Sequence, residues 1–279
     1  MLPPSRSHGI SRRELLKGMA AAGIGTVTGA AAHGYLYERH HIEITRETVG
    51  VSGLPTPLAG LRIGLLTDLH RSQTVPGAML DRAVTLIMSE APDIIVLGGD
   101  YVTWGDKRYV VPAAEALAPI SAPHGVFAVL GNHDNDRDMP PALSSNGFVV
   151  LRDARTRLTI RGETLELAGL RYWTRRVTDL AHVLRGASPN IILVAHTPMR
   201  LIEAAALGVP LVLSGHTHGG QIKIRDDEKR LIRRRKLSSG LHQRKNSQIY
   251  ITRGIGTVVL PVRYQCPPEI SFLELRCTE

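Results

Sequence analysis

The sequence predicts an α/β fold in which helices cover a buried β-sheet. Short unbroken apolar runs recur along the chain, segments with a helical pattern lie between several of them, and a cluster of polar residues follows each run. Unbroken apolar runs are typical of strands that are buried on both faces, and strand–helix alternation is typical of an α/β sheet. The runs that predict these strands are residues 61–66, 94–97, 126–130, 191–194 and 211–213.

The other predicted elements complete this pattern. Residues 42–60 are expected to form a lead-in strand and a turn rich in Pro and Gly. Residues 148–172 alternate as short runs joined by tight turns, which predicts an antiparallel or mixed section of sheet. Because no repeat or low-complexity segment divides it, we expect residues 42–279 to be one domain. Helices are predicted at residues 78–90, 109–117 and 198–207.

Residues 1–41 are expected to be a targeting segment and a linker. Arg12 and Arg13 precede a weakly apolar run over residues 18–32, and this arrangement resembles a bacterial twin-arginine export signal. The alanines at 30–32 offer a cleavage site, and the run is short for a membrane span, which needs about 20 strongly apolar residues. We therefore predict export by the twin-arginine machinery to the periplasm or cell envelope. A retained membrane anchor and an ordinary basic terminus are the alternatives.

The net charge of +9 is concentrated in two segments. Residues 1–20 hold four basic residues against one acid, and residues 223–246 hold ten Lys and Arg against three acids. The rest of the chain is therefore nearly neutral, which argues against specific nucleic-acid binding. The segment 223–246, with its run at 233–236, is a solvated loop or, alternatively, a contact for anionic membrane or wall polymer.

The polar clusters after the predicted strands indicate a metal site. A single Asp or His after a strand is usually a cap or a turn residue. Five clusters at corresponding strand ends, however, should meet at one edge of the sheet. Imidazole and carboxylate ligands suit manganese, iron, zinc or cobalt. The clusters contain Asp68 and His70; Asp100; Asn132, His133 and Asp134; His196; and His216 and His218.

In order and spacing, these motifs resemble the calcineurin-like metallophosphoesterases. The sequences at 219–221, 253–256 and 267–270 are similar to those of a bacterial subgroup related to the YkuE and YaeI proteins. The resemblance implies a four-layer αββα sandwich with two mixed sheets. It further implies two divalent metal ions, of which manganese is the expected one.

The resemblance also implies a role for each site residue. Asp68, His70 and His218 would hold one metal, and Asn132, His196 and His216 would hold the other. Asp100 would bridge the two, since each carboxylate oxygen can reach one ion. His133 would be the general acid or transition-state donor, and Asp134 would orient it.

Residues outside the ligand set have two interpretations. Arg253 either contacts the substrate phosphate or anchors its own turn. Thr67 and Gln221 adjoin ligands and are expected to donate hydrogen bonds to them or to pack against them.

These observations predict a phosphoesterase of the bacterial cell envelope that acts on phosphomonoesters or phosphodiesters through a metal-activated water. A lipid-linked substrate is the narrower hypothesis. The alternatives are a hydrolase of lipid A metabolism that resembles UDP-2,3-diacylglucosamine pyrophosphatase and a catalytically weak metal-binding scaffold of the envelope. A nuclease or cyclic-nucleotide phosphodiesterase is disfavoured by the neutral body of the chain.

Overall fold

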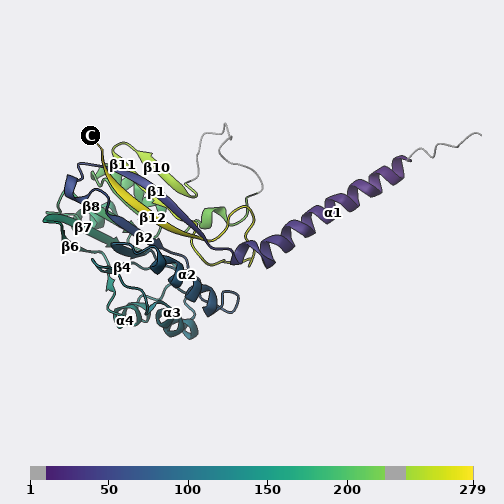
Figure 1. Ribbon diagram of the computed structural model, residues 1–279, viewed down its shortest axis with the longest axis horizontal. Helices are drawn as coiled ribbons and strands as arrows, with labels where there is room; N and C mark the ends of the chain where they lie inside the picture. Colours follow the sequence, from purple (N-terminus) through teal and green to yellow (C-terminus); the bar gives the residue numbers. More distant parts are fainter. Residues whose placement is uncertain (1–10, 224–236, 279) are drawn as a thin grey trace, which may run out of the picture.

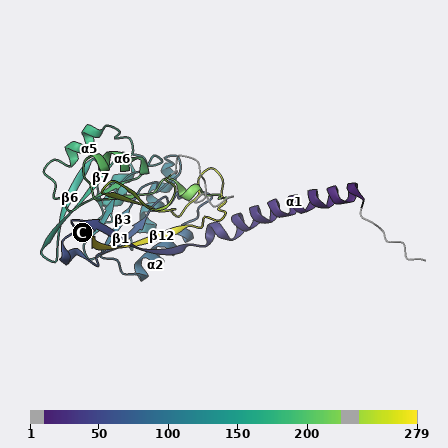
Figure 2. The ribbon, with the colours of Figure 1, turned by 90° about the horizontal axis from the view of Figure 1, so that it is seen from above.

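The computed structural model describes residues 11–223 and 237–278. Two six-stranded sheets lie face to face, and helices cover the outer face of each (Figures 1 and 2). The predicted α/β class and the four-layer αββα sandwich are both confirmed.

The first sheet has the strand order β1-β12-β2-β3-β4-β5. Strands β2 to β5 are parallel, β12 is antiparallel to β2, and β1 is parallel to β12. Its strands are β1 (Glu43–Ser52), β2 (Arg62–Leu66), β3 (Ile94–Leu97), β4 (Val126–Ala128), β5 (Val149–Val150) and β12 (Glu269–Thr278).

The second sheet has the order β10-β11-β9-β8-β7-β6. Strands β7, β8, β9 and β11 are parallel, and an antiparallel strand lies at each edge. The antiparallel pair β6 and β7 confirms the mixed section that the sequence predicts in mid-chain. The strands are β6 (Ala154–Ile160), β7 (Glu163–Leu170), β8 (Ile191–Ala195), β9 (Leu211–Ser214), β10 (Gly240–Arg244) and β11 (Ser247–Ile251).

Alternation along each central strand builds the apolar layers. In β3, Ile94 and Val96 point between the sheets, whereas Ile95 and Leu97 point outward beneath the helices. Both faces are buried, which explains why the strand is apolar at every position. The covering helices are α2 (Gly77–Ser89), α3 (Val110–Leu117) and α4 (Met139–Ser144) on the first sheet, and α5 (Val177–Val183) and α6 (Leu201–Ala206) on the second.

Short 3-10 turns extend several of these elements. The segments predicted as helices at 109–117 and 198–207 each begin with a 3-10 turn and continue as α3 and α6. The 3-10 turns are η1 (Glu38–His40), η2 (Thr56–Leu58), η3 (Lys107–Tyr109), η4 (Pro198–Arg200) and η5 (His218–Gly220).

Helix α1 (Arg12–Leu36) projects away from the sandwich in both views (Figures 1 and 2). By length and composition it could cross a membrane, and a signal sequence would have the same properties. Its end contacts the sandwich, because Arg263 N donates to Gly34 O at 3.3 Å and Cys266 N donates to a Glu38 carboxylate oxygen at 2.6 Å. Residues 34–38 of the predicted linker therefore pack against the domain.

The base of α1 lies at the edge of the sandwich where the central strands end. Strand β1 begins at Glu43, soon after α1, and runs parallel to β12. Because β12 is antiparallel to β2, strands β1 and β12 begin at the edge where β2, β3 and β4 end. The sequence predicts the polar clusters at this same edge.

Candidate metal centre and active site

The polar clusters at the strand ends meet between the two sheets. Asp68, Asp100 and Asn132 follow β2, β3 and β4, while His196 and His216 follow β8 and β9. Several of these residues adopt a left-handed backbone, which is uncommon for residues other than Gly and clusters at functional sites. The positive φ angles are 54° at Asp68, 49° at His70, 57° at Asp100, 72° at His216 and 51° at His218.

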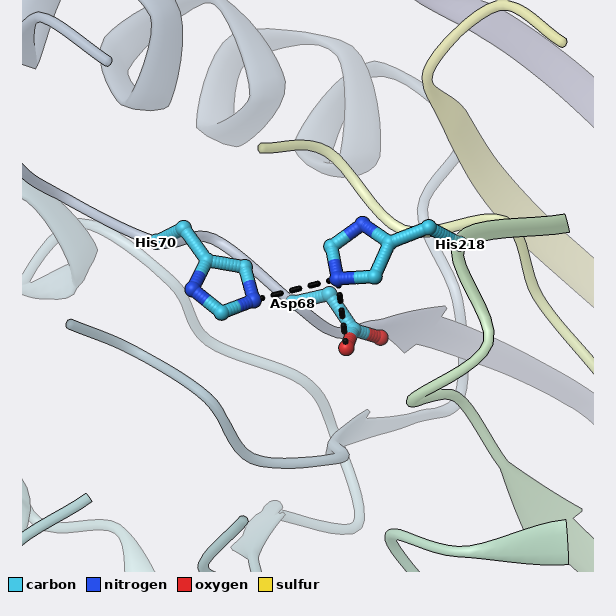
Figure 3. A group of neighbouring side chains, drawn as sticks. All are labelled: Asp68, His70 and His218. Carbon is cyan, nitrogen blue, oxygen red and sulfur yellow. Dashed lines mark hydrogen bonds and ion pairs between the residues drawn. The ribbon is translucent and has the colours of Figure 1, made fainter. Parts of the chain in front are cut away.

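The first group of ligand atoms comes from Asp68, His70 and His218 (Figure 3). The Nε2 atoms of His70 and His218 lie 3.1 Å apart, and His218 Nε2 lies 3.5 Å from Asp68 Oδ1. All three residues are buried, and the two imidazoles and the carboxylate point toward one another. Such converging donors could hold one divalent ion.

The second group comes from Asp100, His196 and His216. His196 Nε2 lies 3.0 Å from Asp100 Oδ2 and 3.2 Å from His216 Nδ1. Asn132 supplies an independent test of fit, because its buried Oδ1 has no hydrogen-bond donor among the described residues. A buried amide oxygen without a partner is costly, and a metal ion would satisfy it.

Asp100 belongs to the second group and also approaches the first. Its Oδ2 is 3.5 Å from His70 Nε2 and 3.0 Å from His196 Nε2. Its other oxygen, Oδ1, accepts the backbone N–H of His133 at 2.8 Å, which fixes the orientation of the carboxylate. The same oxygen, Oδ2, therefore faces both groups, so a bridging role would use Oδ2 rather than one oxygen for each ion as the sequence predicts.

Contacts behind the imidazoles direct their Nε2 atoms toward the centre. His196 Nδ1 lies 2.8 Å from Gly98 O, and His70 Nδ1 lies 3.3 Å from Thr103 Oγ1. A carbonyl partner requires the proton on Nδ1 and leaves the Nε2 lone pair of His196 for a metal.

The buried histidines of the site differ in the direction of their pKa shift. Burial lowers the pKa of His70 to about 3 and the pKa of His218 to about 4, so both are neutral and able to bind a metal at pH 7. Burial alone would also lower the pKa of His196, but the charges of Asp100 and Asp68 outweigh it and raise this pKa to about 10. In the metal-free protein a proton on His196 therefore balances the two carboxylates.

A family model for calcineurin-like phosphoesterases matches residues 61–220, which include both ligand groups. The chain belongs to this family. The phosphoesterase is 30% identical over 285 residues to the Bacillus subtilis protein named "Uncharacterized metallophosphoesterase YkuE", with 96% of this chain and 99% of that protein covered. It is 29% identical to "Phosphodiesterase YaeI" of Escherichia coli, with 95% and 99% covered. Family membership makes the chain a phosphoric ester hydrolase with a divalent metal site.

A solved structure shares the fold of this phosphoesterase. The NAD nucleotidase NadN of Haemophilus influenzae superposes with a TM-score of 0.51 at 15% identity. The match covers 70% of this chain and 45% of that chain. At this identity the similarity concerns the fold alone.

His133 lies beside the ligands and is held by the loop after β3. The Trp104 backbone N–H donates to His133 Nδ1 at 3.0 Å, and the two rings lie 4.3 Å apart. Because Nδ1 accepts a hydrogen bond, the neutral ring carries its proton on Nε2. Burial lowers the pKa of His133, and Asp100 acts in the opposite direction.

Asp134 contacts different groups from those expected. Its carboxylate accepts backbone N–H groups from Asp100 at 2.7 Å, Tyr101 at 2.8 Å and Gly131 at 2.9 Å. Within the described parts of the chain, no hydrogen bond joins it to the imidazole of His133. Asp134 therefore ties the loop after β3 to the loop after β4, and Trp104 is the residue that orients His133.

Arg253 is held in ion pairs, as expected of a residue that anchors its own turn. Its Nε donates to Glu269 at 2.5 Å, and its Nη2 donates to Glu43 at 3.0 Å. Thr67 donates its hydroxyl to the Asp68 carboxylate, as a residue supporting a ligand should. Gln221 instead bonds to the backbone of residues 258 and 260 and holds that loop.

Three residues near the metal centre could not be identified from the sequence. Arg263 is fully buried, and its Nη2 lies 3.5 Å from His218 Nδ1. Its signal was a single charge within the apolar run 258–264. Trp104 and Tyr172 contact His133 and His216 respectively, and no pattern in the sequence distinguishes them.

The basic run 233–236, a predicted contact for anionic membrane or wall polymer, lies outside the described residues.

Proposed function

We propose that the protein is a binuclear phosphoesterase, with manganese as the expected metal, that hydrolyses phosphomonoesters or phosphodiesters in the cell envelope. The observation that carries this proposal is the position of Asp100 between two converging ligand groups. One ion would be held by Asp68, His70 and His218, and the other by Asn132, His196 and His216, with Asp100 shared. When bound, divalent ions supply positive charge for the phosphate oxygens and make a water nucleophilic at neutral pH.

His133 would serve the leaving group. Its Nε2 carries the proton in the neutral ring, because Nδ1 is occupied by the Trp104 N–H. A lowered pKa keeps this ring neutral at pH 7, so it would donate a hydrogen bond to the oxygen on which charge develops. The backbone N–H of His133 is held by Asp100, so the donor is fixed relative to the shared ligand.

Aromatic side chains border the site and would contact the ester substituents; Trp104 and Trp173 are exposed, and Tyr172 is half-buried. Trp104 packs against His133, and Tyr172 packs against His196 and His216. Trp173 lies edge-on to Tyr172, and the guanidinium group of Arg175 lies over the Trp173 ring. Both tryptophans of the chain therefore lie beside the metal centre, which supports a substrate that has an organic group attached to its phosphate.

Export to the envelope is proposed from the N-terminal segment. Helix α1 begins at the paired arginines and has a capping box formed by Ser11 and Glu14. A fusion of residues 1–41 to a folded reporter should be exported, and lysine in place of both Arg12 and Arg13 should retain the reporter in the cytoplasm. Equal export of both fusions would remove the twin-arginine part of the proposal.

A pair of chromogenic esters tests the activity. The manganese-loaded full chain should hydrolyse bis-p-nitrophenyl phosphate or p-nitrophenyl phosphate, and His133→Asn should keep its metal while losing turnover. The ratio of the two rates would identify the preferred ester class. A loaded protein that hydrolyses neither ester would favour the scaffold alternative.

A further inference from the structure

Two distant segments that meet at the base of α1 both expose apolar residues. Loop residues 258–262 have the sequence Val-Val-Leu-Pro-Val, and Val259 and Leu260 are 82% and 55% exposed. Tyr35, Leu36 and Tyr37 are exposed at the end of α1, next to this loop. We call these five exposed residues, Tyr35, Leu36, Tyr37, Val259 and Leu260, the apolar rim.

The backbone of the loop is held in a costly conformation. Val259 has a φ of 64°, a left-handed value that is rare for a β-branched residue. Gln221 holds the loop there, since its amide donates to Leu260 O at 2.7 Å and its carbonyl accepts Val258 N–H at 3.0 Å. Strain that exposes apolar side chains to solvent indicates a contact surface, because isolated soluble domains rarely expose contiguous apolar residues.

Helix α1 has the charge and aromatic distribution of a membrane span. Its 25 residues extend about 37 Å, which exceeds the roughly 30 Å hydrocarbon thickness of a bilayer. Arg12, Arg13 and Lys17 lie at its start, as at a cytoplasmic end. Tyr35 and Tyr37 lie at its other end, where aromatic residues are enriched at the membrane–water interface.

Two residues connect the metal centre to the base of α1. Arg263 donates its backbone N–H to Gly34 O at 3.3 Å, and its Nη2 lies 3.5 Å from His218 Nδ1. Cys266 makes a second link, from the Glu38 carboxylate to the backbone oxygen of His218. The carboxyl ends of the strands, the metal ligands and the apolar rim therefore lie at one edge of the sandwich.

We propose that α1 remains in a membrane and that the apolar rim lies in its headgroup layer, so that the metal centre faces the membrane surface. A phosphoester headgroup of a membrane lipid then reaches the metal centre without leaving the bilayer. This substrate class rests on the proposed phosphoesterase function, whereas the position of the rim can be measured independently.

Depth-dependent fluorescence quenching tests the position of the rim. The full chain is reconstituted in vesicles of phosphatidylcholine and phosphatidylglycerol, with and without brominated phosphatidylcholine. Val259→Trp should be quenched strongly by the brominated lipid. Leu207→Trp is the matched control, because Leu207 is an exposed apolar residue at the end of α6, on the edge where β9 begins. The native tryptophans contribute equally to both variants, and equal quenching of the two would overturn the proposal.

A matched pair of diesters tests access to the substrate. Hexadecyl p-nitrophenyl phosphate partitions into the vesicles, whereas ethyl p-nitrophenyl phosphate stays in solution, and both release p-nitrophenol. The double variant Val259→Asp, Leu260→Asp should lower hydrolysis of the hexadecyl ester about tenfold and leave that of the ethyl ester unchanged. An equal effect on both esters would overturn the membrane proposal. Failure of the unsubstituted protein to hydrolyse the ethyl ester would instead contradict the phosphoesterase function.

A mature chain found in cells without α1 and in the soluble fraction would also overturn the membrane proposal.

Discussion

The close approach of Gly131 to Asp100 gives a quantitative prediction for Gly131→Ala. A Cβ at this position would lie 2.7 Å from both the Cγ and the backbone N of Asp100, and nearer still to Oδ1. Rotation of the Asp100 side chain cannot relieve a clash that includes its backbone, so the loops after β3 and β4 must separate by about 1 Å. Asp100 would then leave its position between the two ligand groups. Misplacement on that scale can cost about 100-fold in rate, so diester turnover should fall by about that factor.

The assay is diester hydrolysis by Gly131→Ala at saturating manganese, together with a manganese binding isotherm. Gly77→Ala is the matched control, because Gly77 has no atom closer than 4.0 Å to the added Cβ and lies at the start of α2. Turnover within threefold of the control, about 0.6 kcal/mol in activation free energy, would refute the argument that Gly131 is required for the position of Asp100.

Three further predictions concern the groups around the centre. His133→Ala should lower turnover about 10²–10⁴-fold with metal content unchanged, as measured by steady-state kinetics and metal analysis; loss of metal would make it a ligand instead. Arg263→Leu leaves buried carbonyls of the surrounding loop without hydrogen-bond donors. It should therefore lower the free energy of unfolding by roughly 3–5 kcal/mol, as measured by urea denaturation of the metal-free protein. A change below about 1 kcal/mol would contradict the role of Arg263 in holding this loop. The raised pKa of His196 means that a metal must displace a proton at any pH below about 10, so manganese affinity should rise by up to about tenfold from pH 7 to pH 8 with proton release; an affinity independent of pH would exclude this competition.

The sign of the His196 effect follows from the direction of its shift. Because its pKa is raised on folding, the pairing of His196 with Asp100 stabilises the metal-free protein fully below pH 6.5. That stability is lost as the pH rises through about 10. Metal and proton therefore compete for the Nε2 atom of His196, and the loaded protein should not show this loss.

The sheet core and the clusters of Asp and His at the strand ends could be predicted because they depend on local pattern. A strand such as β3 is buried on both faces, so its sequence is apolar at every position and its end is marked by Gly99 and Asp100. Parallel strands in one sheet bring such ends to the same edge, so the proximity of Asp68 and Asp100 follows from the strand assignment. His196 follows β8 of the second sheet, and its convergence with them depends on how the two sheets pack.

Side-chain direction within a cluster could not be predicted. His133 and Asp134 are neighbours in sequence, yet the imidazole faces the ligands and the carboxylate faces the backbone of two loops. Adjacent residues in an irregular loop have no fixed angular relation, unlike those in a helix or strand. Adjacency in the sequence therefore did not identify the residue that orients His133.

Contacts between distant segments were also beyond the sequence pattern. Arg263 joins the base of α1 to His218, and its surroundings are backbone carbonyls from residues 253–267 that carry no sequence signature. The apolar run at 258–262 resembles a buried strand by composition, but a strained turn at Val259 exposes it. Tertiary context, rather than local propensity, decides both features.

Metal stoichiometry in the full chain and in Asp100→Ala tests the central claim most directly. If Asp100 is shared between two sites, the purified protein should bind about two divalent ions per chain, and the variant should lose at least one of them together with diester turnover. Two ions retained with unchanged turnover in Asp100→Ala, or no ions in the unsubstituted protein, would contradict a two-metal centre built on Asp100.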